Sequence, residues 1–160
     1  MIYVFDTSAL LWAYIPRSRY CRRCRYVIGR SKGRVYVAEI TILEIASALG
    51  AAVRDRRISV DQYWEANKCF LRDVASKRLL VIPLPPSEYA GCRHLLALVG
   101  IEAGRGIKTQ DAMVAYSARS LALNQGKQVR LLTSDRQLAN IVNQSRVFKG
   151  LVRSIYLPRN

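Results

Sequence analysis

The feature that most constrains the fold is the apolar, β-prone run at residues 2–5, which ends abruptly at Asp6. Small hydroxyl residues and a helix-like apolar pattern follow it directly. This succession is typical of a buried strand that delivers one carboxylate to a strand-to-helix turn. Asp6 is therefore either a helix cap or the first member of a metal site.

Further apolar runs alternate with helical patterns along the chain. Strands are predicted at residues 2–5, 35–38, 79–84, 129–133 and, as an edge strand, 152–157. Helices are predicted at residues 8–14, 41–54, 60–76, 87–99, 109–124 and 135–143, with a glycine-containing loop at 100–106. This alternation predicts an α/β fold with three α/β/α layers, in which the central sheet is mainly parallel and has four or five strands.

The length and composition suit one globular domain. The chain has 160 residues, of which 51% are hydrophobic, and no linker or repeat divides it. We therefore expect residues 1–160 to form a single domain. No apolar run approaches the about 20 residues that span a bilayer. No basic segment precedes the first apolar stretch, so we expect a cytoplasmic protein without a secretory signal.

The formal net charge of +15 predicts a polyanionic partner, with nucleic acid as the first choice. The charge comes mainly from arginine, whose planar guanidinium binds phosphate through two parallel hydrogen bonds. A basic surface without a partner stays open as an alternative. Charge alone does not separate RNA from DNA.

The stretch from residue 17 to 34 is strongly basic, with tyrosines between its arginines. A helix here would carry one basic face, formed by Arg19, Arg22, Arg23 and Arg30 together with Tyr26. This face is either a solvated helix surface or an RNA-binding surface that follows the phosphate backbone. The sequence favours neither alternative.

Four cysteines, Cys21, Cys24, Cys69 and Cys92, raise the question of a zinc site. A structural zinc needs four Cys or His ligands. Beyond the Cys21-x-x-Cys24 pair, the chain offers only scattered cysteines and a single histidine, His94. Cys21 and Cys24 fall on one stripe of a predicted helix, which favours apolar packing. A disulfide remains an open alternative.

Four of the 11 acidic residues occupy similar positions, either at the end of an apolar strand or in the first turn of a helix; they are Asp6, Glu44, Asp111 and Asp135. Each has a structural explanation when it is taken alone. Asp6 and Asp135 suit helix N-caps, and Thr41-x-x-Glu44 has the form of a capping box. Asp111 complements the positive end of its helix.

Taken together, the same acids predict a metal site. In a parallel α/β sheet, the carboxyl ends of the strands and the following helix N-termini gather at one edge. Four acids at that edge would repel one another unless a cation lay among them. Carboxylates without a His or Cys cluster favour Mg²⁺ or Mn²⁺ over zinc. Such a cation would offset repulsion between the acids and a phosphodiester, and it would make a water acidic enough to attack phosphorus.

The acidic segments resemble the successive motifs of PIN domains, in the family's order and over nearly the whole chain. The segments are Phe5-Asp6-Thr7-Ser8-Ala9-Leu10, Ile42-Leu43-Glu44-Ile45, Ile107-Lys108-Thr109-Gln110-Asp111-Ala112 and Leu131-Leu132-Thr133-Ser134-Asp135. Their spacing is similar to that of small single-domain members, the VapC toxins of toxin–antitoxin pairs.

This resemblance implies a ribonuclease that holds Mg²⁺ or Mn²⁺ at Asp6, Asp111 and Asp135, with Glu44 assisting directly or through water. Supporting roles in hydrogen-bonding the acids or positioning water fall to four hydroxyl residues: Thr7, Ser8, Thr133 and Ser134. The resemblance also implies a homodimer and a cognate antitoxin, a segment of which occupies the active-site groove.

The sequence therefore predicts a metal-dependent endoribonuclease, the toxin of a type II toxin–antitoxin pair. The alternative is a non-catalytic or RNA-processing PIN-domain protein that acts in RNA binding or ribonucleoprotein assembly. A haloacid-dehalogenase-like phosphatase fits poorly, because that family has a second Asp where Ser8 stands. Two further acids near the motifs, Glu39 and Glu102, are interpreted as surface residues.

Overall fold

The computed structural model describes residues 1–16, 20–31, 34–103 and 106–158. Within these ranges the strands are β1 (Ile2–Phe5), β2 (Val35–Ala38), β3 (Leu80–Ile82), β4 (Val129–Thr133) and β5 (Val152–Tyr156). The α-helices there are α1 (Thr7–Tyr14), α2 (Cys21–Arg30), α3 (Glu39–Arg54), α4 (Val60–Ala75), α5 (Tyr89–Ala103), α6 (Thr109–Gln125) and α7 (Arg136–Gln144). Two short 3-10 turns, η1 (Pro86–Glu88) and η2 (Arg146–Phe148), precede α5 and β5.

The described strands form one parallel sheet of five strands in the order β3-β2-β1-β4-β5. β1 lies at the centre, where Val4 pairs with Tyr36 of β2 and with Leu131 of β4. Because a parallel sheet is covered on both faces, its inner strands are nearly continuous apolar runs, and Val4 and Leu131 are fully buried. The predicted α/β/α architecture is confirmed, including the edge strand that follows residue 151.

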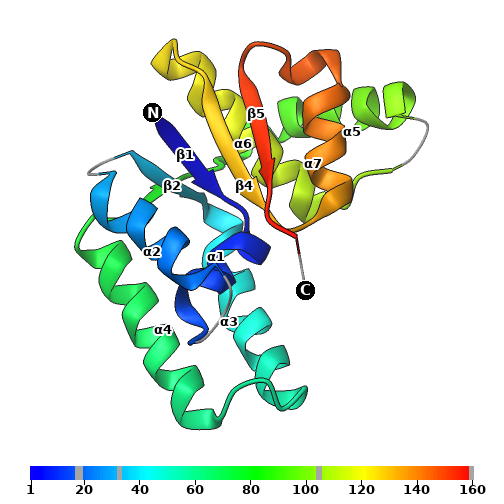
Figure 1. The fold of residues 1–160 in the computed structure, drawn as a ribbon. Helices are drawn as coiled ribbons and strands as arrows, with labels where there is room; N and C mark the ends of the chain where they lie inside the picture. Colours follow the sequence, from blue (N-terminus) through cyan, green and yellow to red (C-terminus); the bar gives the residue numbers. More distant parts are fainter. Residues whose placement is uncertain (17–19, 32–33, 104–105, 159–160) are drawn as a thin grey trace.

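Helices cover both faces of the sheet, with α1–α4 on one side and α5–α7 on the other (Figure 1). Successive side chains of β1 therefore enter different cores. Phe5 packs with Leu10 in the core under α1–α4, whereas Val4 packs with Val114 in the core under α5–α7. The register pairs Phe5 with Leu132, so the carboxyl ends of β1 and β4 lie side by side.

The start of α3 differs from the prediction. The helix begins at Glu39, directly after β2, with Ala38 at the N-cap position and no side-chain cap. Thr41 therefore lies inside the helix, where it is fully buried. The predicted capping box between Thr41 and Glu44 is wrong, because packing of Thr41 against the core overrides its preference for a helix terminus.

The α5 region also differs from the prediction. The helix continues to Ala103, so it includes the first part of the predicted loop. Gly100 lies inside the helix at a cost of about 1 kcal/mol relative to alanine. Burial of the neighbouring Val99 side chain in the core offsets that cost. None of the helices in the described ranges is both long and apolar enough to cross a membrane.

α2 occupies only the middle of the basic stretch, and Arg19 lies outside the described residues. Arg22, Arg23 and Arg30 are exposed along the helix, whereas Cys24 is buried in the core. Apolar packing of Cys24 is therefore confirmed. The chain's four cysteines all fall within the described ranges, and all are free thiols.

Candidate metal centre

The structure brings the four predicted acids to one cavity of about 580 Å³ at the carboxyl edge of the sheet. Asp6 directly follows β1, and Asp135 follows β4 at the start of α7. Glu44 comes from the second turn of α3, which begins where β2 ends, and Asp111 from the first turn of α6. Parallel strand ends and helix N-termini thus converge, as the topology of such a sheet requires.

Asp6 is held by hydroxyl groups rather than by a helix. It occupies the N-cap position of α1, but its side chain makes no capping hydrogen bond. Its Oδ2 accepts a short hydrogen bond from Ser8 Oγ and another from Thr133 Oγ1 at 2.8 Å. No described residue donates a hydrogen bond to Oδ1. The carboxylate is only 5% exposed, so these two donors fix its orientation and leave Oδ1 for a ligand.

The same hydroxyl groups connect the ends of β1 and β4. Ser8 Oγ accepts from the Ser134 backbone N–H at 2.9 Å, and Thr133 Oγ1 accepts from the Asp135 N–H at 2.9 Å. Ser8 Oγ and Thr133 Oγ1 lie 3.3 Å apart. Each hydroxyl therefore accepts a hydrogen bond from a backbone N–H just after β4 and donates another to Asp6. These bonds align the carboxyl ends of β1 and β4.

Asp135 combines a structural role with a free oxygen. Its Oδ1 accepts from the backbone N–H groups of Gln137 at 2.7 Å and Leu138 at 3.0 Å, which caps α7. Its Oδ2 has no partner among the described residues. The helix therefore orients the carboxylate, and one oxygen still faces the cavity that the residue lines.

Glu44 is positioned from α1. Thr7 Oγ1 donates to Glu44 Oε2 at 2.6 Å. Burial raises the pKa of Glu44, the hydrogen bond from Thr7 opposes this shift, and the nearby Asp6 carboxylate adds to it. Thr7 thus anchors the side chain and favours its charged form.

The raised pKa of Asp111 is the clearest electrostatic evidence that the acids lie close together. This pKa is raised to about 6, first by burial and then by the carboxylates of Asp6 and Asp135. Lys108 lowers the pKa and Glu44 raises it slightly. Asp111 makes no hydrogen bond or ion pair with any described residue. Like charges in one cavity resist simultaneous ionisation, and either a proton on Asp111 or a bound cation relieves that repulsion.

Among the described residues, two cations line the cavity together with the acids: Lys108 and Arg57. Lys108 is the N-cap residue of α6, three positions before Asp111, and Arg57 is paired with Asp55 at 3.0 Å. Neither was predicted as a site residue. The placement of Lys108 within the third acidic segment is the one sequence signal that could have indicated it.

The donor set fits a hard cation that keeps part of its water shell. Among the described residues, no group of three or more His, Cys, Asp and Glu side chains is placed so that it could hold a metal ion by itself. Mg²⁺ does not require such a group, because one or two carboxylates, waters and a substrate phosphate complete its coordination. Carboxylates of this kind line the cavity at Asp6, Asp111 and Asp135, and no His or Cys among the described residues lines it to favour zinc.

Apolar side chains line the cavity as well, namely Leu11 and Trp12 from α1, Ile15 after it, and Ala48 and Ala51 from α3. The cavity therefore combines charged and apolar lining. Such a site can hold a cation and a phosphate together with a flat, partly apolar group.

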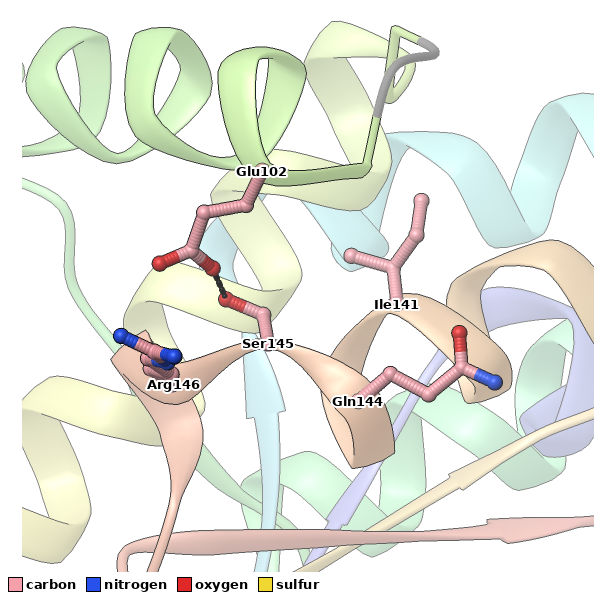
Figure 2. A pocket seen from close by; sticks show the side chains of 5 residues that line it. All are labelled: Glu102, Ile141, Gln144, Ser145 and Arg146. Atoms are coloured by element: carbon pink, nitrogen blue, oxygen red, sulfur yellow. Dashed lines mark hydrogen bonds between the residues drawn. The ribbon is translucent and has the colours of Figure 1, made fainter.

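Other predicted residues lie away from these acids. Arg22, Arg23 and Arg30 do not line the cavity in the described part of the chain, and Arg30 lies over the Tyr26 ring at 5.8 Å from its centroid. Glu102 lines a different cavity of about 340 Å³, where it accepts a hydrogen bond from Ser145 (Figure 2).

Glu39 is also separate from the site. Its side chain is exposed, and its Oε2 accepts from the Leu84 backbone N–H at 3.0 Å. The interpretation of Glu39 and Glu102 as surface residues is therefore confirmed by their exposure. Each also joins two segments of the fold.

The fold resembles those of three solved structures, of which VapBC-5 is described as a member of the VapBC family of toxin–antitoxin systems. VapBC2 from Rickettsia felis, bound to a DNA fragment from its promoter, has a TM-score of 0.61 and 15% identity, with 96% of this chain and 98% of that chain covered. VapBC-5 from Mycobacterium tuberculosis has a TM-score of 0.58 and 19% identity, with 98% of both chains covered. FitAB bound to the IR36 DNA fragment has a TM-score of 0.64 and 14% identity, with 99% of both chains covered.

At these identities the likeness establishes a shared fold. No curated protein has a significantly similar sequence. Residues 3–143 match the PIN-domain family model, and the chain belongs to the PIN-domain family.

Proposed function

We propose that this PIN domain, spanning residues 1–160, is a metal-dependent endoribonuclease. The observation that carries the proposal is the cavity lined by all four acids, in a chain whose net charge is +15. An acidic cavity repels a phosphodiester by itself, whereas the large positive charge of the whole chain attracts one. The combination is useful to a protein that binds nucleic acid and brings a cation to its backbone.

In this proposal, Asp6, Asp111 and Asp135 hold Mg²⁺ or Mn²⁺, and Glu44 assists. The bound cation supplies Lewis acidity at the scissile phosphate and a water of lowered pKa. Ser8 and Thr133 keep Asp6 oriented through the hydrogen bonds to its Oδ2. Further support comes from Thr7, through Glu44, and from Ser134, through its backbone N–H.

Lys108 has a role on the substrate side in this proposal. Its ammonium lines the acidic cavity and lowers the pKa of Asp111. A cation there can contact the non-bridging oxygens of a phosphate and offset charge that develops on them. The apolar lining around Trp12 can accept the neighbouring base.

The biological setting proposed is that of a cytoplasmic toxin in a type II toxin–antitoxin pair. Support comes from the fold shared with VapBC2 and with VapBC-5, which is described as a member of the VapBC family of toxin–antitoxin systems. The partners proposed are RNA as substrate, a cognate antitoxin, and a second copy of the chain in a homodimer. A cavity open to solvent between α1 and α3 offers a segment of an antitoxin direct access to the acids.

The test of the nuclease is cleavage of a fluorescent single-stranded RNA in Mg²⁺, in Mn²⁺ and in excess EDTA, with single-stranded DNA in parallel. We expect divalent-dependent RNA cleavage that Asp6→Asn and Asp111→Asn each abolish. Asp61→Asn is the matched control, because it removes the same charge from an exposed site on α4. Full activity in EDTA or in either cavity variant contradicts the mechanism. RNA binding without cleavage would favour the alternative role in RNA binding or ribonucleoprotein assembly.

The toxin assignment has a separate test in cells. Expression of the wild-type chain should arrest growth of a bacterial host, and expression of Asp111→Asn should not. Co-expression of the short reading frame next to the gene should restore growth. Unrestricted growth with active protein present would favour RNA processing instead.

A further inference from the structure

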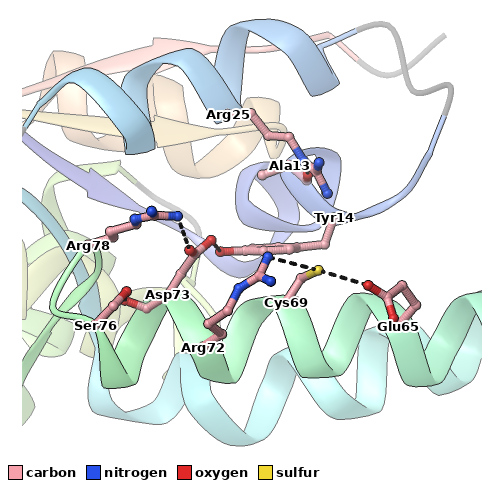
Figure 3. A network of polar contacts seen from close by, with 9 residues as sticks. All are labelled: Ala13, Tyr14, Arg25, Glu65, Cys69, Arg72, Asp73, Ser76 and Arg78. Carbon is pink, nitrogen blue, oxygen red and sulfur yellow. Dashed lines mark hydrogen bonds and ion pairs between the residues drawn. The ribbon is translucent and has the colours of Figure 1, made fainter.

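A second polar pocket, of about 130 Å³, lies between α2 and α4 and is called the α2–α4 pocket here (Figure 3). Three arginines of the described chain line it: Arg25 from α2, Arg72 from α4, and Arg78 from the segment after α4. Tyr14 and Asp73 also line it. The sequence analysis did not select these arginines, because three separate segments contribute them.

Arg25 and Arg72 are each positioned by a hydrogen bond that leaves other guanidinium N–H donors available. Arg25 donates through Nε to the Ala13 carbonyl at 2.7 Å, which leaves its two terminal nitrogens available. Arg72 donates from one terminal nitrogen to Cys69 Sγ at 3.5 Å, a weak acceptor. Neither side chain has a carboxylate partner among the described residues. The guanidinium groups of Arg25 and Arg72 therefore line the pocket with N–H donors that are available to a ligand.

Asp73 is the carboxylate in the described lining of the pocket, and both of its oxygens already accept hydrogen bonds from protein groups. Asp73 Oδ2 accepts from the Tyr14 hydroxyl at 2.9 Å, and Oδ1 accepts from Arg78 at 3.3 Å. Burial and the adjacent Asp73 both raise the pKa of Tyr14, so its phenol stays a donor. The described part of the lining thus holds three positive groups and one negative group. Arg78 is 60% exposed and can contact a further anion.

We infer that the α2–α4 pocket binds one phosphate of the RNA backbone, next to the four-acid cavity. Its volume is well below the about 300 Å³ at which pockets begin to enclose whole small ligands, so it suits a phosphate and excludes a nucleotide. Gly29 also lines the pocket, and a Cβ at that position would meet no atom within 4 Å apart from its chain neighbours and its own helix backbone.

The end of α1 separates the two sites. Tyr14 lines the α2–α4 pocket, and the next two residues, Ile15 and Pro16, line the four-acid cavity. A strand whose scissile phosphate lies at the acids can therefore cross this turn and place a later phosphate among the arginines. This inference rests on the proposed function for the identity of its ligand, a single-stranded RNA.

The experiment is fluorescence anisotropy with a labelled single-stranded RNA and the full chain in EDTA, repeated over a range of salt concentrations. Arg72→Gln should bind about tenfold more weakly, since a charge-assisted hydrogen bond contributes roughly that factor. Its salt dependence should be shallower by about 0.7 in the slope of log K against log salt, as expected for one phosphate contact to a single strand. Arg93→Gln, which removes an exposed charge from α5 on the opposite face, is the matched control.

Equal losses in Arg72→Gln and Arg93→Gln would overturn the inference, because diffuse charge would then explain the binding. Calorimetric binding of inorganic phosphate that Arg72→Gln abolishes, with RNA affinity unchanged, would assign the pocket to a free anion instead. If binding of a Glu-rich peptide requires Arg72 and binding of RNA does not, the α2–α4 pocket is a protein-docking site. Thermal unfolding of each variant checks that the fold is intact.

The two proposals fail separately in these assays. Wild-type RNA cleavage combined with Arg72-independent binding refutes the pocket and leaves the nuclease standing. Arg72-dependent binding in EDTA without any divalent-dependent cleavage refutes the nuclease and leaves the pocket standing. A chain that binds no RNA in EDTA overturns the pocket, whatever its activity.

Discussion

Asp111→Asn should stabilise the metal-free protein at pH 8, although it removes a candidate ligand of the metal. The reason is the cost of ionising this acid in its cavity. Its pKa is raised from 3.8 to about 6 by burial and by the carboxylates of Asp6 and Asp135. Asparagine has nearly the same shape and carries no charge, so it removes that cost.

The sign follows from proton binding. Between pH 3.8 and about 6 the folded chain holds the Asp111 proton more tightly than the unfolded chain, so the free energy of unfolding falls as the pH rises. Below this window there is no penalty, and above it the penalty is complete. A shift of this size corresponds to at most about 3 kcal/mol, and solvent reaching this half-buried carboxyl reduces the value to about 1–2 kcal/mol. For a domain of this size, that raises Tm by roughly 2–8 °C.

The assay is thermal unfolding in EDTA at pH 4 and pH 8. The Tm of Asp111→Asn should exceed that of the wild type at pH 8, and the difference should nearly vanish at pH 4. Asp61→Asn controls for loss of an exposed charge and should not show this gain. A wild type that equals or exceeds Asp111→Asn at pH 8 would refute the electrostatic reasoning.

Three further outcomes are expected. Mg²⁺ or Mn²⁺ at 100 times its Kd should stabilise the wild type by about 2.7 kcal/mol, and the same concentration should stabilise Asp111→Asn by less. The rise in Tm measures both effects, and equal rises in Tm would rule out binding at the acids. Thr133→Val should lose about 1–3 kcal/mol in urea unfolding, because a buried hydrogen bond to Asp6 and another from Asp135 disappear; an unchanged midpoint would contradict this. Asp135→Ala should lose about 1 kcal/mol through the uncapped α7. Asp135→Asn should keep its cap and its stability but not its cleavage activity, and equal stability of both variants would dismiss the capping role.

The sheet and the positions of the acids could be predicted because local sequence specifies them. Apolar runs mark the strands, and Asp6 and Asp135 mark where two of them end. Once the sheet is parallel, those ends must share an edge. The meeting of acids from distant segments is thus a consequence of topology, and it needs no knowledge of individual contacts.

The contacts within the site could not be predicted in the same way. The approach of Ser8 to Thr133 joins residues 125 positions apart, and no local pattern encodes it. Thr41 has the propensity of a helix cap, but its burial depends on how α3 packs. Asp6 occupies a cap position, yet the hydroxyls of the neighbouring strand end hold its carboxylate instead.

The arginines of the α2–α4 pocket could not be predicted from local sequence either. The basic stretch before β2 was visible in the sequence, but the described residues of the predicted face, Arg22, Arg23, Tyr26 and Arg30, are exposed to solvent. Arg25 reaches the α2–α4 pocket because α2 packs against α1, where the Ala13 carbonyl accepts its hydrogen bond. Its companions Arg72 and Arg78 lie more than forty positions later in the chain.

The strand order has a consequence for how the protein is made. β1 is synthesised before the other described strands and lies at the centre of the sheet, but one of its edges pairs with β4, which follows it by more than 120 residues. Until residues 129–135 exist, Asp6 lacks its Thr133 donor and the cavity lacks its fourth acid. A chain emerging from the ribosome therefore carries an unfinished centre until β4 has been made. If the chain cleaves RNA, this delay withholds the activity until Asp135 has been synthesised.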